Sequence, residues 1–376
     1  AGSSAASDVY KRQGIGIARA ANGRTKMINI AIIGAGIGRE HLAALRELSS
    51  EFRVVAVVDQ NLKRIEEIRS GDTFAALTDI TKVLTDPEID IIDICLPPHL
   101  HVSVTLDALS FGKHVICEKP LATSLADVDR ISDAAKRSGC YVFPVFQYRW
   151  GPSLAQLRHL MASGLAGQVQ VASLETHWSR EYDYYSVPWR GTWSGERGGA
   201  VLGHAIHNHD LLTHIAGEVA ALSAMTATRV NEIETEDCAS ITFAMTSGAL
   251  CTSSITLGAA GDETRLRFVF ENLTATSGTA PYAPGGQPWT FTARFKDQQH
   301  EIDKAVVNTP LEAVGFEGFF TEIGKAINAQ ENSAVTLEEG AASISLVTAI
   351  YHSSRTGARV NLPLLPEHEL YKGWLP

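Results

Sequence analysis

Short apolar runs alternate with helical patterns from Met27 to about residue 149. The runs are apolar at consecutive positions, which is typical of parallel strands that helices cover on both faces. The segments between them follow the helical period, as in 39–50, where Leu42, Leu45 and Leu48 share one face. The pattern therefore predicts a doubly wound parallel sheet with right-handed crossovers. Its expected strands lie in residues 28–36, 53–60, 89–98, 113–120 and 140–149.

After Trp150 the pattern changes to extended segments that follow one another. Several of them alternate apolar and polar residues, as in SITFAM (240–245), which indicates an antiparallel sheet with one buried face. These strands are expected in residues 168–178, 221–230, 239–245, 249–258, 264–272 and 289–296, and two helices in 311–328 and 336–357. We expect an α/β chain with a Rossmann domain at 27–149 and an α+β domain with a large open sheet at 150–376.

Composition narrows the function classes. The net charge of −10 argues against a basic surface for nucleic acid, and the longest apolar run is far shorter than the about 20 residues that cross a bilayer. Five widely spaced cysteines without a C-x-x-C motif favour free thiols in a reducing compartment, so we expect a cytoplasmic protein. The exposed face of the second sheet is expected to join copies of the chain into a homodimer or homotetramer.

The first residues are set apart from the fold. SSAASDVYKRQ (3–13) has no apolar period and resembles a translated transposase adapter from a sequencing library. We therefore expect residues 1–26 to be a non-native leader and Met27 to be the natural start.

A glycine-rich turn joins the first strand to the first helix. In the segment Gly34-Ala35-Gly36-Ile37-Gly38, the missing side chains allow a tight turn and close approach of a diphosphate to the helix N-terminus. The usual G-x-G-x-x-G spacing puts the third glycine at position 39, where this chain has Arg39. Asp59, at the end of the second strand, can accept hydrogen bonds from both ribose hydroxyls and repels a 2′-phosphate. The sequence thus predicts a dinucleotide site that prefers NAD over NADP.

Several motifs, taken in order, resemble the Gfo/Idh/MocA family of NAD(P)-dependent oxidoreductases. The most specific is Glu118-Lys119-Pro120 preceded by GKHVIC, together with GGAVLGHAIHNHD at 198–210. The resemblance implies a Rossmann domain followed by a C-terminal α/β domain with an open sheet, and an active site between them. It also implies oxidation of a secondary alcohol on a sugar, polyol or sugar-acid-like substrate, or the reverse reduction, with NAD or NADP.

The same resemblance implies roles for single residues. Lys119 would lie beside the nicotinamide ribose and hold the substrate oxygen, where its charge favours the developing alkoxide. Glu118 would position Lys119 or contact the nicotinamide. Pro97, Pro98 and His101 would line the cofactor.

The histidine-rich segment supplies the second half of the implied site. His207 is the candidate proton acceptor, since an ordinary histidine pKa near 6.5 suits proton transfer near neutral pH. Asp210 would orient the imidazole or bind substrate. Gly203 stands where many relatives carry an aspartate; His204 beside it is a candidate replacement, or Lys119 and His207 act alone.

Two further expectations concern ligands. The spacing of the histidines would also permit zinc, but the implied chemistry needs no metal, because the cofactor accepts the electrons. The aromatic segment 176–193 precedes the histidines, and aromatic faces stack on sugar rings while charged groups hold hydroxyls. Trp189 and Arg190, with Tyr148 and Arg149, are the predicted substrate-binding residues.

Two other functions remain open from the sequence. One is a NAD-bound regulatory protein without turnover, which the gap at Gly203 favours weakly and the presence of Lys119 and His207 disfavours. The other is a hydrolase or lyase that uses tightly held NAD transiently and releases no net NADH.

Overall fold

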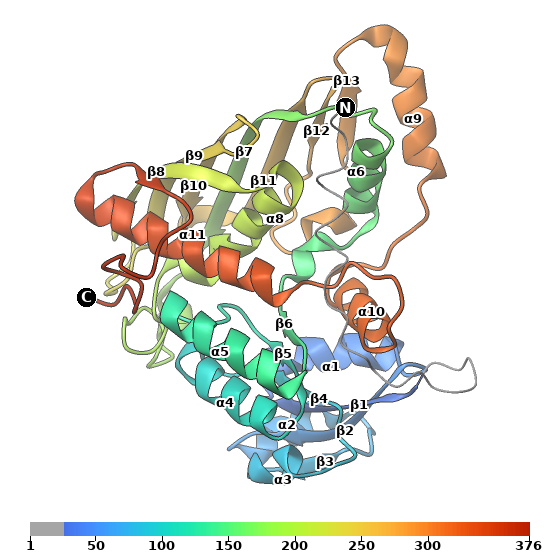
Figure 1. Cartoon of the computed structure of the whole chain (residues 1–376), viewed down its shortest axis with the longest axis vertical. Coiled ribbons are helices and arrows are strands. Elements are labelled where there is room, and N and C mark those ends of the chain that lie inside the picture. The colour runs from blue at the N-terminus through green and yellow to red at the C-terminus, as the bar shows by residue number, and fades with distance from the viewer. Residues whose placement is uncertain (1–25) are drawn as a thin grey trace.

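The computed structural model describes residues 26–376. The predicted leader therefore lies outside the described residues, apart from Lys26. The first sheet is parallel throughout, in the order β3-β2-β1-β4-β5-β6 (Figure 1). Its strands are β1 (Ile28–Ile33), β2 (Phe52–Val58), β3 (Ala75–Leu77), β4 (Ile91–Ile94), β5 (His114–Cys117) and β6 (Val142–Pro144).

The consecutive apolar residues explain this sheet, because β1 and β4 are buried along their whole length. Two details differ from the prediction. The edge strand β3 was missed, since it has only three residues and none of them is buried. The expected strand at 140–149 is short: β6 covers three residues, and Gln147–Arg149 form a 3₁₀ turn.

The second sheet has the order β13-β12-β11-β7-β10-β9-β8-β14 and is mainly antiparallel; only the β7–β10 pair is parallel among the described strands. Alternating burial along β9 shows that one face is covered, as the sequence pattern predicted. The strands are β7 (Val169–Ser179), β8 (Val219–Ala227), β9 (Cys238–Met245), β10 (Leu250–Thr256), β11 (Gly258–Phe270), β12 (Leu273–Thr276), β13 (Thr290–Ala293) and β14 (Val360–Asn361). The predicted fold class is confirmed.

The helices belong to both parts of the chain. They are α1 (Gly38–Glu47), α2 (Leu62–Arg69), α3 (Thr81–Leu84), α4 (Pro98–Ser110), α5 (Leu125–Ser138), α6 (Pro152–Ala162), α7 (Tyr182–Tyr185), a π-helix (Val201–Ala205), α8 (Ile206–Ala216), α9 (Gln299–Asn308), α10 (Gly315–Ile327) and α11 (Leu337–Thr356). The sequence prediction missed the helices α3, α6, α7 and α9 and the strands β12 and β14. None of the helices within residues 26–376 is long and apolar enough to cross a lipid bilayer.

Helix α11 joins the two sheets. It packs on β8 of the second sheet and also contacts β6 of the first sheet and the neighbouring helix α5. In Figure 1 it runs between the two sheets. A capping box at its start, in which Thr336 and Glu339 bond each other's backbone N–H, fixes where it begins. The carboxyl end of β5 and the start of α8 are thereby held close together, and the candidate site lies at this junction.

Candidate active site

The glycine turn fits a dinucleotide. A Cβ at Gly34 would lie 2.3 Å from the Cys95 carbonyl oxygen, and φ there is +103°, so this position requires glycine. A Cβ at Gly38 would lie 2.8 Å from Ile32, which shows that Gly38 allows the close helix–strand packing although it comes one place early. Gly36 has open space beside it, and α1 begins at Gly38, so the N-terminus of this helix, which favours a negative charge, lies at the turn.

Asp59 lies beside this turn. Its Oδ2 accepts the Ala35 N–H at 2.9 Å, and its Oδ1 accepts the Asn61 N–H at 2.8 Å. A carboxylate has about four acceptor sites, so both oxygens can still accept ribose hydroxyls. The residues present therefore fit the adenosine half of NAD.

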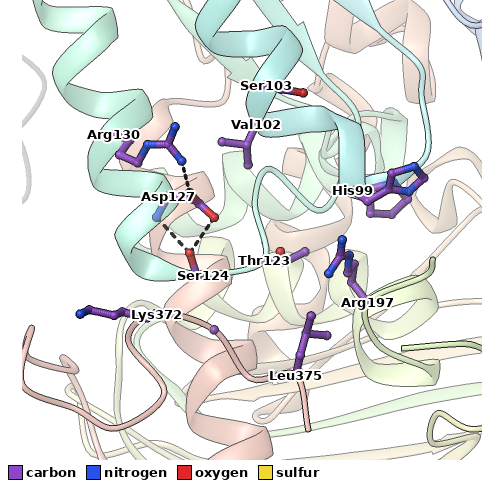
Figure 2. A pocket seen from close by; sticks show the side chains of 12 residues that line it. His99, Val102, Ser103, Thr123, Ser124, Asp127, Arg130, Arg197, Lys372 and Leu375 are labelled. Atoms are coloured by element: carbon purple, nitrogen blue, oxygen red, sulfur yellow. Dashed lines mark hydrogen bonds and ion pairs between the residues drawn. The ribbon is translucent and has the colours of Figure 1, made fainter. Parts of the chain in front are cut away.

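The segment after β4 was also expected to line the cofactor. Pro97 caps α4 and Pro98 is its first residue. Pro98 borders an open hollow of about 480 Å³, which Arg197 and Lys372, near the C-terminus, also line (Figure 2). His101 does not present its ring there: it is fully buried, and its two ring nitrogens bond the carbonyls of Pro120 and Leu96 at 2.7 Å each. The structure thus assigns His101 to joining two loops and corrects the expectation that it touches the cofactor.

Lys119 extends from the carboxyl end of β5 toward the second domain. Its Nζ donates to the Gly203 carbonyl oxygen at 2.7 Å, so it contacts the π-helix that leads into α8. Burial lowers the pKa of Lys119 below its usual value, against the carboxylates of Glu118 and Glu196. The predicted lysine and the histidine-bearing helix are therefore neighbours.

A buried network holds the backbone of Lys119. His41 Nε2 lies 3.1 Å from Glu118, and its Nδ1 lies 2.9 Å from Asp93. Burial alone would lower the pKa of His41, but Asp93 and the neighbouring Cys95 raise it well above its usual value. His41 thus neutralises two carboxylates, and Glu118 accepts the Lys119 N–H at 3.0 Å. Glu118 thus contacts the backbone of Lys119, and its expected role in positioning Lys119 stays a prediction.

His41, Asp93 and Cys95 also form the one group of possible metal ligands found within residues 26–376. Their atoms already bond one another, since Cys95 Sγ lies 3.5 Å from His41 Nδ1. None of the three comes from the histidine-rich helix.

His204 and His207 are both buried near Lys119. Burial, with the charge of Lys119, lowers the pKa of His207 to about 3, so this histidine is neutral at physiological pH. The expectation of an ordinary pKa near 6.5 was wrong, because the sequence does not show the burial. The Nδ1 atoms of both rings are buried without a hydrogen-bond partner among the described residues, so each ring keeps one unsatisfied polar atom beside Lys119.

Arg149 and Asp210 pair with each other. The Arg149 guanidinium donates two bonds to Asp210, at 2.8 and 2.6 Å, and a third at 2.5 Å to Glu339 of α11. Both residues are 3% exposed. Asp210 is therefore bonded to Arg149 and not to His207, and the expected binding of substrate by these two residues stays a prediction.

The aromatic residues form one wall of the site. The Tyr148 ring stacks on His207 at 4.4 Å, while its hydroxyl donates to the Pro281 carbonyl at 3.2 Å. The Arg190 guanidinium lies 3.9 Å from the ring centre of Tyr184 and 4.6 Å from that of Trp189. Arg190 thus faces the site, Trp189 supports it, and Tyr148 shapes the surroundings of His207.

The sequence interpretation missed three residues of this site: His41, Tyr184 and Glu196. Glu196 lies two residues before the glycine pair of the histidine motif, and this position was the one available signal. Nothing in the sequence pairs His41 with Glu118, which lies 77 positions away.

Comparison with known proteins places both halves of the chain. Residues 28–146 match the model of an oxidoreductase family with an NAD-binding Rossmann fold, and residues 154–276 match the GFO/IDH/MocA C-terminal domain. Among curated relatives, levoglucosan dehydrogenase of Pseudarthrobacter phenanthrenivorans is 28% identical over 54% of this chain and 55% of its own length. Myo-inositol 2-dehydrogenase of Thermotoga maritima is 28% identical over 51% and 55%. The aligned part thus spans about half the length of these two relatives.

Among solved structures, the WlbA dehydrogenase from Bordetella pertussis, in complex with NADH and UDP-GlcNAcA, superposes with a TM-score of 0.78. It is 25% identical, and the match covers 90% of this chain and all of that one. The two domain models follow the order of the two sheets described above. The chain therefore belongs to the GFO/IDH/MocA family of oxidoreductases, whose N-terminal domain is an NAD-binding Rossmann fold.

Proposed function

We propose that the protein is an NAD-dependent dehydrogenase that oxidises a secondary alcohol of a sugar, polyol or sugar-acid-like substrate, or reduces the corresponding ketone. The observation that carries the proposal is the 2.7 Å contact between Lys119 and Gly203. It brings an ammonium from the cofactor domain to the helix that bears His207. The relatives named for levoglucosan and myo-inositol support a substrate with several hydroxyl groups.

Different residues would bind the cofactor and act on the substrate. Bound NAD would accept a hydride from the alcohol carbon. The glycine turn and Asp59 would hold its adenosine half. Lys119 would bind the substrate oxygen and stabilise the negative charge that develops on it. His207, which is neutral, would accept the proton that the hydroxyl loses as the hydride leaves, so that the alcohol becomes a ketone.

The charges around the site favour an electron-rich substrate. Lys119, Arg180 and Arg190 all act on His204 electrostatically and lower its pKa well below the usual value, after burial, which is the main cause. Arg180 is already bonded to Asp262 at 2.9 Å, whereas the nearest carboxylate oxygen to Arg190 is 3.6 Å away. Arg190 thus has donors left for a hydroxyl or carboxylate group.

A substrate screen tests this function. Sugars, polyols and sugar acids are incubated with NAD, and NADH is followed by absorbance at 340 nm, with product identified by mass spectrometry. We expect NADH to form with one substrate class. Product without net NADH would indicate a hydrolase or lyase, and saturable ligand binding without any product would indicate a regulatory protein.

Replacing Asp59 with alanine is expected to loosen cofactor preference. The carboxylate repels a 2′-phosphate, so its loss should reduce the ratio of NAD to NADP affinity by about tenfold. Dissociation constants from NADH and NADPH fluorescence measure this ratio. A wild-type protein that already binds NADPH more tightly would contradict the role given to Asp59.

A further inference from the structure

Glu196 is a buried carboxylate that the function described above leaves unused. It is 6% exposed and lies in the loop between α7 and the π-helix. Its Oε2 accepts the Gly191 N–H at 2.6 Å. Its Oε1 has only long contacts, 3.4 Å from the Tyr184 hydroxyl and 3.6 Å from Arg190. A carboxylate oxygen usually accepts hydrogen bonds shorter than about 3 Å, so Oε1 has acceptor capacity left.

This oxygen lies next to position 203. A Cβ built on Gly203 would have one neighbour within 4 Å outside its own stretch of helix, and that neighbour is Glu196 Oε1 at 3.6 Å. The carbonyl of the same glycine accepts the bond from Lys119. The carboxylate and the ammonium therefore both lie beside Gly203, where the motif has no side chain.

We propose that Glu196 is a positioning residue for Lys119, which acts on the ammonium through space from beside Gly203 and supplies the negative charge which that position lacks. The proposal rests on the dehydrogenase function above for its kinetic consequences. It also explains how the site can keep its charge balance although the family aspartate is absent at position 203.

The effects of the neighbouring charges on the pKa values of Lys119 and Glu196 agree with this role. Burial lowers the pKa of Lys119, and the carboxylates of Glu118 and Glu196 raise it, against Arg190 and Arg180. Burial raises the pKa of Glu196, against the Gly191 amide, Arg190, Lys119 and the Tyr184 hydroxyl. Tyr185, from α7, and His204, from the π-helix, also face this group of charges. Glu196 thus helps to keep Lys119 protonated when a substrate oxygen binds.

Three variants test the proposal in the NAD-loaded protein. Glu196→Gln should lower kcat/KM about 10- to 100-fold and shift the alkaline limb of the pH profile down by about one pH unit, because Lys119 loses an opposite charge. Gly203→Asp alone should also lower activity, since two adjacent carboxylates cannot both ionise readily. Combining the two changes restores one carboxylate at this place, so the double variant should be more active than either single variant. Glu181→Gln, which removes an exposed carboxylate at the N-terminal end of α7, is the matched control and should change neither quantity.

Two results would overturn the proposal. One is wild-type kcat/KM and an unmoved pH profile in Glu196→Gln. The other is a loss of activity that Gly203→Asp does not relieve and that leaves the alkaline limb in place, because this is what a purely structural residue would give.

A measurement without substrate separates this proposal from the proposed function. Lysines are dimethylated with ¹³C, the signal of Lys119 is assigned with Lys119→Arg, and its pKa is followed by NMR with NAD bound. A lower amine pKa in Glu196→Gln supports the pairing even if no substrate turns over, in which case only the dehydrogenase function fails. An unchanged amine pKa overturns the pairing.

Discussion

Replacing Lys119 with alanine is expected to lower kcat about 10²- to 10³-fold while the dissociation constant of NAD stays within a few-fold of wild type. The ammonium reaches across the domain junction to Gly203, so its removal takes away the charge that would face the substrate oxygen. The glycine turn and Asp59 keep their geometry, because their contacts do not involve Lys119. Steady-state kinetics and NADH fluorescence titration measure the two quantities.

The matched control is Lys136→Ala, which removes an exposed lysine from the last turn of α5 and should leave both kcat and NAD affinity unchanged. An unchanged kcat in Lys119→Ala would overturn the role of this lysine. A large loss of NAD affinity would instead move Lys119 from the substrate to the cofactor.

The sequence predicted the two sheets because their signals are local. A strand such as β1 is apolar at every buried position, and the alternation along β9 reports its one covered face. Among the elements that were missed, the edge strands β3 and β14 have weak local signals. β3 and β14 are two or three residues long, and their pairing with longer neighbours defines them. The sequence therefore predicts an element well when the element's own residues carry most of its burial.

The site was predicted less completely, because charge partners depend on contacts between distant parts of the chain. The motif resemblance identified Lys119 and His207, and the structure brings their segments together. The motif resemblance could not show that Arg149 forms an ion pair with Asp210, 61 positions away. Nor could it show that both ring nitrogens of His101 bond backbone carbonyls. Burial also changes chemistry: the pKa of His207 falls to about 3 only because the folded chain excludes water there.

Replacing Arg149 with methionine is expected to reduce the free energy of unfolding by about 3–5 kcal/mol, since it leaves Asp210 buried and uncompensated. Asp210→Asn should cost a similar amount. The double variant should lose less than the sum of the two, because the pair is coupled. Urea denaturation followed by circular dichroism gives these values. Arg130→Met is the matched control: it breaks an exposed pair with Asp127 and should cost less than about 1 kcal/mol.

The same variants decide between structure and substrate binding. The Arg149 guanidinium links the 3₁₀ turn after β6 to α8 and α11, so its loss should weaken the support of the helix that carries His207. Because the Arg149 guanidinium is bonded to Asp210 and Glu339, we expect molecules of Arg149→Met that do fold to keep the wild-type KM. A stable Arg149→Met protein with a strongly raised KM would return Arg149 to the substrate site. In that case the ion pair with Asp210 would have to open when substrate binds.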